Sequence, residues 1–242
     1  MVSSRLLLFF FILPFSPLSA AASGSASKVS LGLYYESLCP YSANFIVNYL
    51  AKIFDDGLIS IVDLDLVPYG NARIRNGTMV CQHGPYECLL NTVEACAINS
   101  WPDLNKHFRF IYCVESLVAK HKYFEWQSCF SETGLDSAGV LECYDNEYGK
   151  ELELKYAVQT DALDPPHKYV PWVVVDGQPL YEDYENFEAY VCKAYSGEPP
   201  KVCSELSLIT NQVKEATGRI SYADGISSTT VSDDKTKIKM VI

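Results

Sequence analysis

The chain has 242 residues, of which 48% are hydrophobic and 13% aromatic, and its 30 acidic and 19 basic side chains give a net charge of −11. This length fits one or two domains, and the apolar content is sufficient for a buried core, so a wholly disordered chain is excluded. An acidic chain without a basic run is a poor ligand for polyanions, so we expect no nucleic-acid partner.

The first residues have the pattern of a secretory signal peptide. Arg5 precedes an apolar run over residues 6–13, and small residues follow at 19–22. Two prolines interrupt the run, which is shorter than the ~20 residues of a spanning helix, so a membrane anchor is the weaker interpretation. We therefore expect a leader over residues 1–22, no membrane span and a mature chain in the secretory pathway.

The chain has nine cysteines, and all of them follow this leader. In an oxidising compartment such a set favours disulfides over metal ligands, so we expect no metal site. Eight cysteines can pair and one is left over, and the sequence does not determine the connectivity. The candidates for pairing are Cys81, Cys88, Cys96, Cys113, Cys129, Cys143, Cys192 and Cys203. Asn76 begins the sequon Asn-Gly-Thr and is the candidate glycosylation site on a surface loop.

The first part of the chain reads as strand, helix, strand. Residues 29–35 are rich in strand formers, and a helix begins at Cys39-Pro40 and stops at Gly57. Residues 58–67 have the pattern of a second strand. This order predicts a βαβ unit with a parallel strand pair.

From about Cys88 to Ala162 the pattern is helical. Asp103 is a candidate N-cap, and one further helical stretch carries the apolar positions from Leu141 to Leu152. Six of the nine cysteines lie between residues 81 and 143, so we expect this block to be held by disulfides as well as by packing.

The strand pattern returns after the helical block. Residues 170–175 predict a strand, Asp176-Gly177 predicts a hairpin turn, and residues 178–180 begin the return strand. A closing helix is expected over residues 186–194. Beyond Cys203 the chain is rich in Ser, Thr, Asp and Lys, so we expect a C-terminal extension over 204–242 that is partly disordered, with a mobile tail from 221.

Cys39 is the candidate catalytic residue. It stands between the first strand and a helix N-terminus, where unpaired N–H groups and the helix dipole stabilise an anion. The thiolate is the reactive form of cysteine, so this position activates Cys39 as a nucleophile. The alternative is a structural half-cystine, and the odd cysteine count favours the free thiol.

The segment from Cys81 to Cys96 reads CQHGPYECLLNTVEAC. It resembles the signature CQHGxxECxxNxxxxC of the gamma-interferon-inducible lysosomal thiol reductase (GILT) family, with every fixed position present. Three more segments are similar to the family and most similar to its plant members, namely YYESLCPY at 34–41, VPYGNA at 67–72 and YVPWV at 169–173.

The resemblance covers residues 29–203 and implies an α/β fold. Specifically, it implies a GILT-type, thioredoxin-like domain with a disulfide-stapled helical insertion over about 81–165. It also implies a soluble glycoprotein of the lysosomal or vacuolar route, or a secreted one, that reduces disulfides at acidic pH.

Val170 and Pro171 are the candidate substrate edge. In a thioredoxin-like domain a cis-proline before the third strand lies across from the reactive cysteine and keeps a backbone edge open to an extended substrate. A trans proline at a strand start is the alternative, because cis bonds are only about 5–6% of X–Pro bonds. The order of the elements in this chain favours the cis form.

The active-site motif departs from the family pattern. The family has Cys-x-x-Cys, whereas this chain has Cys39, Pro40, Tyr41 and Ser42. In the two-cysteine mechanism the first thiolate forms a mixed disulfide with the substrate, and the second cysteine resolves it. A hydroxyl forms no disulfide, although Ser42 could donate a hydrogen bond to the Cys39 thiolate. The first half-reaction remains possible, and the second needs an outside thiol.

The signature contains other candidate groups. His83 and Glu87 could act as acid and base, and Cys81 could replace the missing resolving thiol, but a disulfide-stapled loop in which His83 and Glu87 bond locally is the favoured interpretation. A zinc site made by His83 with the cysteines at 81, 88 and 96 is the weakest alternative.

The leading hypothesis is a thiol–disulfide oxidoreductase that uses Cys39 alone and acts on disulfide-bonded proteins. It needs no bound cofactor, and cysteine or glutathione would serve as the external reductant. One alternative is a non-catalytic or weakly active binder of unfolded or cysteine-rich chains. A third hypothesis is disulfide isomerisation, which needs only one attacking thiol.

Overall fold

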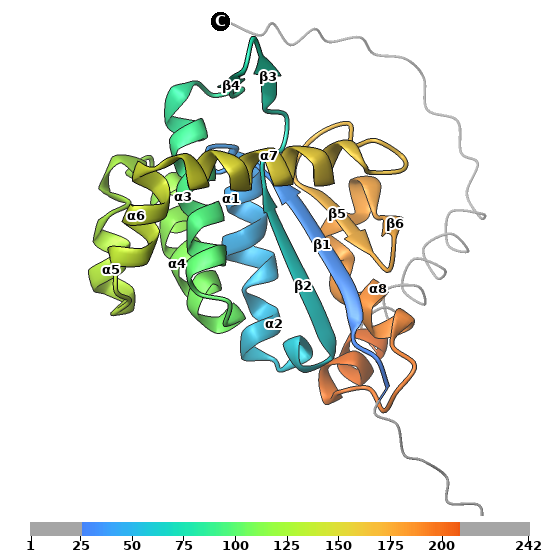
Figure 1. Ribbon diagram of the computed structural model, residues 1–242. Helices are drawn as coiled ribbons and strands as arrows, with labels where there is room; N and C mark the ends of the chain where they lie inside the picture. Colours follow the sequence, from blue (N-terminus) through green and yellow to red (C-terminus); the bar gives the residue numbers. More distant parts are fainter. Residues whose placement is uncertain (1–25, 209–242) are drawn as a thin grey trace, which may run out of the picture.

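A four-stranded mixed sheet forms the centre of the computed structural model, which describes residues 26–208 (Figure 1). The strand order is β2-β1-β5-β6. Strand β1 (Val29–Tyr35) pairs in parallel with β2 (Val62–Pro68) and antiparallel with β5 (Trp172–Val175), which pairs antiparallel with β6 (Gln178–Pro179). The parallel β1–β2 pair confirms the predicted βαβ unit.

Alternation along β1 explains its central place in the sheet. Val29, Leu31, Leu33 and Tyr35 are at most 2% exposed, and they belong to one hydrophobic cluster with residues of α1 (Pro40–Phe45) and α8 (Phe187–Ala194). Burial of each such side chain contributes about 1.5–3 kcal/mol relative to exposure. This face of the sheet packs against the helix that follows β1.

The helical segment after β1 extends over residues 40–55, with a turn at Ala51. It comprises α1 (Pro40–Phe45), the π-helical turn η1 (Ile46–Leu50) and α2 (Lys52–Asp55). Gly57 ends it with a φ of 83°, as predicted. The π turn was not predicted, and it is defined by the bond from the Ala51 N–H to the Ile46 carbonyl, at 3.1 Å.

The second strand starts later than the sequence predicts. Residues 58–61 form the 3-10 turn η2 (Leu58–Ile61), and β2 begins only at Val62. Both the amide and the hydroxyl of Ser60 donate to the Gly57 carbonyl, at 3.1 and 2.8 Å, and close this turn. The prediction was wrong here because apolar residues of a buried 3-10 turn resemble a buried strand.

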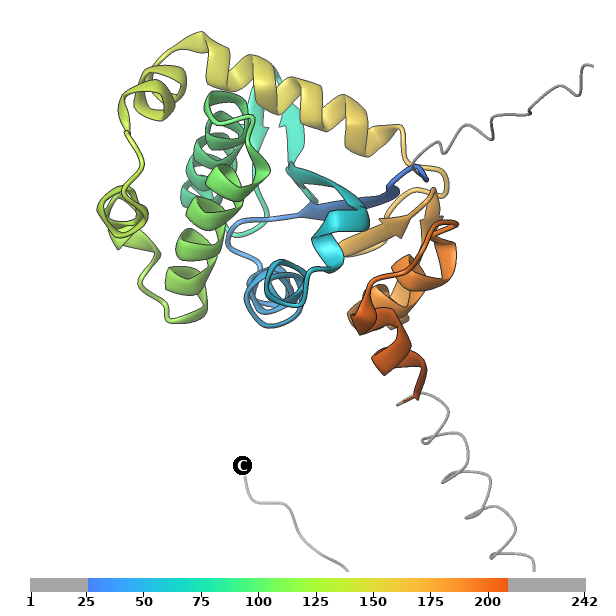
Figure 2. The same cartoon turned by 90° about the horizontal axis from the view of Figure 1, so that it is seen from below.

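The helices form two layers and a lateral bundle around the sheet (Figure 2). Helix α7 (Glu147–Asp161) covers one face, and the helix of residues 40–55 covers the other together with α8. The remaining helices of the block pack beside the edge formed by β2, as their contacts with α1 and β2 also indicate. The helices of this block are α3 (Pro85–Ser100), α4 (Leu104–Ala119), η3 (Tyr123–Glu125), α5 (Ser128–Thr133), α6 (Ala138–Asp145) and α7 (Glu147–Asp161).

Two side chains cap the N-termini of helices in this block. Asp103 accepts a hydrogen bond from the Asn105 amide at 3.0 Å, which confirms the predicted N-cap of α4. The single helical stretch predicted over residues 141–152 is wrong, because the chain breaks at Asn146. The Asn146 side chain accepts from the Tyr148 amide at 2.8 Å and starts α7 as a separate helix.

A short hairpin precedes this block and was not predicted. It consists of β3 (Arg73–Arg75) and β4 (Thr78–Val80), and its turn is Asn76-Gly77 with φ values of 50° and 75°. Asn-Gly with two positive φ angles is typical of a two-residue hairpin turn. Asn76 is exposed at this tip, a position open to solvent.

The eight cysteines expected to pair do so in four disulfides. Cys81–Cys88 closes the loop before α3, Cys96–Cys143 joins α3 to α6, Cys113–Cys129 joins α4 to α5, and Cys192–Cys203 closes the C-terminal part. All nine cysteines are among the described residues, and Cys39 is the free one. The helical block is therefore held by three of these disulfides.

The C-terminal part follows the predicted order. Asp176 and Gly177 have φ values of 45° and 77° and form the predicted hairpin turn between β5 and β6. The turn η4 (Tyr181–Asn186), helix α8 (Phe187–Ala194) and a helical segment over 201–208 follow. Within residues 26–208 no helix is long and apolar enough to span a membrane. The predicted leader and the chain beyond 208 lie outside the described residues.

Candidate active site

Cys39 stands at the junction of β1 and the helix of residues 40–55. It is the N-cap residue of α1, with Pro40 in the first turn, and its carbonyl accepts from the Ala43 amide at 3.0 Å. The Cys39 amide donates to the Glu36 carbonyl at 3.2 Å, which tightens the loop between strand and helix. The side chain is 5% exposed, so the thiol lies just below the surface.

Val170 and Pro171 lie across from this thiol. The bond between them is cis, and the Cys39 Sγ lies 3.8 Å from the Val170 carbonyl oxygen. Trp172 begins β5 immediately afterwards, two residues later than predicted, because this cis segment does not join the β ladder. Among the described residues no hydrogen bond uses the Val170 amide.

Ser42 is buried one turn along the helix from Cys39. Its side chain is 0% exposed, and its hydroxyl has no hydrogen-bond partner among the described residues. The hydrogen bond from Ser42 to the Cys39 thiolate that the sequence made conceivable is therefore not formed in this structure. Tyr41, between them, points outward and is 69% exposed.

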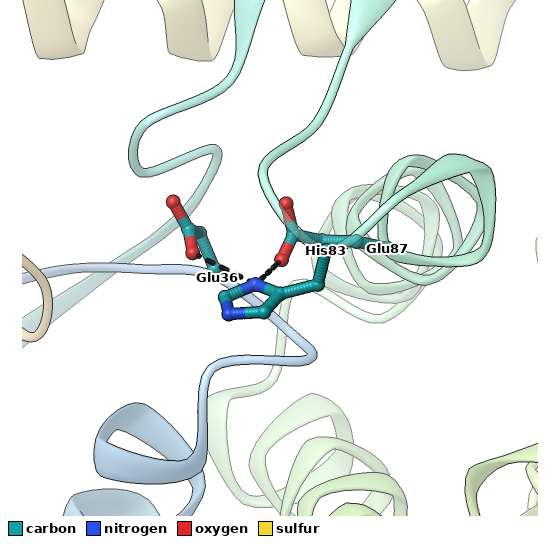
Figure 3. A group of neighbouring side chains, drawn as sticks. All are labelled: Glu36, His83 and Glu87. Carbon is teal, nitrogen blue, oxygen red and sulfur yellow. Dashed lines mark hydrogen bonds and ion pairs between the residues drawn. The ribbon is translucent and has the colours of Figure 1, made fainter.

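His83 lies between two buried carboxylates, as Figure 3 shows. Its Nδ1 forms a short hydrogen bond with Glu87 and lies 3.3 Å from the Glu36 Oε2. Both carboxylates are 0% exposed, whereas the His83 side chain is 33% exposed. The sequence favoured a hydrogen bond of His83 and Glu87 within the signature alone. The structure has this bond, and in addition the contact with Glu36 connects His83 to the loop that precedes Cys39.

Glu36 is fixed by the segment after β2. The Asn71 amide donates to its Oε1 at 2.7 Å, and a Cβ added at Gly70 would collide with the Glu36 side chain. Gly70 also has a φ of 57°, so this position favours glycine for two reasons. Burial raises the pKa of Glu36, and the charge of Glu87 adds to this rise, whereas the Asn71 hydrogen bond and His83 oppose it.

The other fixed residues of the Cys81–Cys96 signature hold the same loop. Asn91 accepts a hydrogen bond from the Ser37 amide at 3.0 Å, and the Ser37 hydroxyl donates to the Glu87 carbonyl at 3.2 Å. Gln82 accepts from the Asn71 side chain at 2.8 Å. The signature is thus a clamp that positions the segment leading into Cys39.

Cys39 and His83 open onto one shallow pocket of about 390 Å³. Its remaining lining comes from the loop before Cys39, from the helix start and from the segment before β5. These residues are Glu36, Pro40, Tyr41, Asn71, Gln82, Lys168, Tyr169 and Val170. The thiol, the imidazole and the cis-proline segment therefore share one solvent-accessible surface.

A second group of buried acids lies behind the site. The Tyr35 hydroxyl donates to the Glu94 Oε2 at 2.6 Å, and Glu94 and Glu115 are both 0% exposed. Burial raises the pKa of Glu94 to about 8, although the interactions of its carboxyl with Tyr35 and Glu115 oppose the rise. Burial raises the pKa of Glu115 well above its ordinary value, with further contributions from Glu94 and Cys39.

One group within residues 26–208 has ligand atoms close enough for a cation. Glu36, His83 and Glu87 place one atom each within 4.8 Å of one another. The zinc site considered from the sequence has a different set of ligands, namely His83 with the three cysteines of the signature. That site is not formed, because Cys81 and Cys88 are bonded to each other and Cys96 is bonded to Cys143. For the same reason Cys81 is not a free resolving thiol in this structure.

Sequence reasoning missed the roles of Glu36, Glu94 and Glu115. A signal was present for the last two, because each stands among apolar residues on the buried face of a helix, Glu94 beside Val93 and Glu115 beside Val114. A carboxyl at such a position is seldom buried unless it has a partner. Nothing local distinguishes Glu36, whose partners are distant in sequence.

Comparisons with known proteins give the same family as the signature. The family model of gamma interferon inducible lysosomal thiol reductase (GILT) matches residues 30–133. The gamma-interferon-responsive lysosomal thiol protein of Arabidopsis thaliana is 43% identical over 209 residues, which cover 84% of this chain and 87% of that protein. The gamma-interferon-inducible lysosomal thiol reductase of Mus musculus is 39% identical over 188 residues, covering 74% and 73%.

A solved structure confirms the fold class. The reduced form of the disulfide bond oxidoreductase DsbG from Mycobacterium tuberculosis aligns with a TM-score of 0.50 at 20% identity and covers 78% of this chain and 88% of that chain. At this identity the likeness concerns the fold alone, which is the expected thioredoxin-like α/β fold with a disulfide-stapled helical insertion.

Proposed function

The chain belongs to the gamma-interferon-inducible lysosomal thiol reductase family of thiol–disulfide oxidoreductases, and from this premise we propose that it reduces protein disulfides through one nucleophilic cysteine, Cys39. The observation that carries this proposal is that Cys39 is the free cysteine and stands at a helix N-terminus, opposite the Val170 carbonyl. The backbone N–H groups of a helix start stabilise a thiolate, the attacking form of cysteine.

The reaction begins with attack of the Cys39 sulfur on one sulfur of the substrate disulfide. A mixed disulfide forms between Cys39 and the substrate, and the second substrate sulfur leaves as a thiolate that takes up a proton. The unpaired Val170 amide supports a role of this segment in binding an extended substrate, because a backbone N–H beside the thiol can pair with a substrate carbonyl.

Resolution of the mixed disulfide depends on an external thiol. Ser42 stands where the family has its second cysteine, and a hydroxyl cannot accept the disulfide. A small thiol such as cysteine or glutathione would attack the mixed disulfide and release the reduced substrate. A second thiol molecule would then free Cys39 and leave as part of a small-molecule disulfide.

The proposed compartment is an acidic part of the secretory route, a lysosome or vacuole, with the cell exterior as the alternative. Relatives named as lysosomal thiol reductases, the signal-like start of the chain and the four disulfides support it. The exposed Asn76 at a hairpin tip is compatible with glycosylation of a chain in that route.

The proposal is tested with the purified mature chain, a disulfide-bonded protein and excess free cysteine at pH 5. We expect substrate disulfides to be lost faster than with cysteine alone, because Cys39 stands beside a substrate-binding edge, whereas free cysteine, with a thiol pKa near 8.5, is almost wholly protonated at pH 5. The matched control is the same chain alkylated at its one free thiol. Equal rates with the native chain, the alkylated chain and cysteine alone would refute the proposal.

Ser42 also favours a second candidate, a non-catalytic binder of unfolded or cysteine-rich chains. Ser42→Cys discriminates between the two, with Ser42→Ala as the control for loss of the hydroxyl. If external thiol resolves the intermediate, turnover of Ser42→Cys at saturating thiol is expected to stay within about threefold of the native rate. A large gain from a near-zero native rate would instead support the binder.

Isomerisation is the third hypothesis, and it differs from reduction in its product. An isomerase regenerates its attacking thiol without net loss of disulfides. Refolding of a scrambled substrate without external reductant therefore separates it from reduction.

A further inference from the structure

His83 is a titratable side chain at the active site that the mechanism above does not use. Its Nδ1 is engaged by Glu87 and faces Glu36, so the carboxylates fix the orientation of the ring. Its Nε2 lies at the opposite edge of the imidazole and points away from the Glu87 carboxylate (Figure 3). Among the described residues no hydrogen bond uses Nε2, and the side chain is one-third exposed.

His83 borders the pocket onto which Cys39 opens. His83 and Cys39 line the same 390 Å³ pocket, together with Pro40. Glu36 links the two residues, because its carboxylate lies 3.3 Å from the His83 Nδ1 and its carbonyl accepts from the Cys39 amide. An imidazole that is held through one nitrogen beside the nucleophile's pocket, with the other nitrogen unbonded, has the usual arrangement of a general acid–base.

We propose that His83 is the general acid–base of this reductase, giving a proton from Nε2 to the leaving substrate sulfur and taking one from the external thiol. The inference rests on the proposed function and adds a second catalytic residue to it. Glu87 and Glu36 are positioning residues, which hold the Nδ1 proton and fix the orientation of the ring.

One catalytic cycle returns His83 and Cys39 to their starting states and conserves protons and electrons. The Cys39 thiolate supplies an electron pair to one substrate sulfur, the S–S bond breaks, and the leaving sulfur takes the Nε2 proton, so that His83 becomes neutral. An external thiol then gives its proton to Nε2, attacks the Cys39 sulfur and displaces the second substrate sulfur, which takes that proton. A second external thiol protonates Nε2 again, attacks the sulfur of the first one, and releases Cys39 as thiolate.

The charges around the ring favour this role over a purely structural one. Two buried carboxylates face one imidazole, so a protonated His83 compensates a negative charge that would otherwise be buried without a partner. Lys168 is the other basic side chain that lines this pocket. A bond to Glu87 alone would have sufficed to cap the loop, whereas the second carboxylate comes from the segment that carries the nucleophile.

The test compares two leaving groups in a single turnover. Reduced protein is mixed with hydroxyethyl disulfide, whose alkyl thiolate needs a proton, or with dithiodipyridine, whose aromatic leaving group is stable without one. Modification of Cys39 is followed by mass spectrometry. For His83→Gln we expect the rate with the alkyl disulfide to fall about 100-fold, and the rate with the aromatic disulfide to change by less than about threefold.

Two further variants provide controls. His121→Asn removes an exposed histidine that lines the neighbouring pocket, and Asn tolerates the positive φ of 57° at this position. It should react like the native chain with both disulfides. Glu87→Gln keeps the shape of the side chain but removes the charge, so it should show the same alkyl-selective loss to a smaller extent.

The outcomes separate this inference from the proposed function. An equal fall with both disulfides in His83→Gln would mean a structural role, and an unchanged rate with the alkyl disulfide would mean no role, and either result would overturn the inference. If the native chain is modified at Cys39 by neither disulfide, the proposed function itself fails. Reaction of His83→Gln with the aromatic disulfide also shows that the variant keeps a reactive thiol, and an unchanged thermal midpoint of unfolding shows that it is folded.

Discussion

Cys39→Ala is expected to lower disulfide reduction to the rate of the external thiol alone, a loss on the order of 1,000-fold or more. No other cysteine can take over, because the remaining eight are bonded in pairs. The measurement is the initial rate of substrate reduction with excess cysteine at pH 5. A parallel search for the mixed disulfide with a substrate peptide should find it in the native chain and not in the variant.

The fold of this variant must be intact for the result to count. Cys39 is 5% exposed, so removal of its sulfur leaves a small cavity and should cost about 1 kcal/mol. Cys39→Ser keeps most of the volume and serves as the matched control, with the thermal midpoint of unfolding as the readout. Activity of either variant above the thiol background would show that another group attacks the substrate.

The sequence predicted those parts of the molecule that depend on local patterns. The strand at 29–35, the helix start at Pro40, the Asp103 cap and the Asp176-Gly177 turn each follow from the chemistry of neighbouring residues. The free state of Cys39 follows from the odd number of cysteines once the others pair.

The arrangement behind the nucleophile could not be predicted in this way. Glu36 and His83 are 47 positions apart, and they meet because Asn91 and Asn71 fix the intervening loops. Such contacts depend on tertiary packing, and no periodicity encodes them. The break at Asn146 was missed because the apolar residues on both sides of it keep one helical spacing. The Asn side chain, however, readily caps a helix, and here it starts α7.

The buried acids also make the stability of the fold depend on pH. Burial raises the pKa of Glu94 to about 8 and that of Glu153 to about 7, from an ordinary value of 4.5. Above pH 4.5 the unfolded chain loses these protons while the folded chain keeps them. The folded state therefore binds more protons, and its free energy of unfolding falls as the pH rises through this window.

Other buried groups add to this trend or oppose it. Burial also raises the pKa of Glu36, Glu115 and Glu188, which act in the same direction. Burial lowers the pKa of His107 and His167, so the unfolded chain binds their protons more readily and stability is lost below about pH 6.5. The carboxyls are more numerous, and maximal stability is thus expected at mildly acidic pH, which suits the proposed compartment.

The free energy of unfolding in urea is expected to be several kcal/mol higher at pH 5 than at pH 8, since each unit of pKa difference corresponds to about 1.4 kcal/mol. Glu153→Gln should flatten this dependence, because an amide at the same buried site of α7 does not titrate. Glu151→Gln removes an exposed carboxyl from the same helix and should leave the slope unchanged. Equal stability at both pH values in the native chain would show that the buried carboxyls are ionised in the folded protein, with their charges compensated, and the link between the fold and an acidic compartment would then be lost.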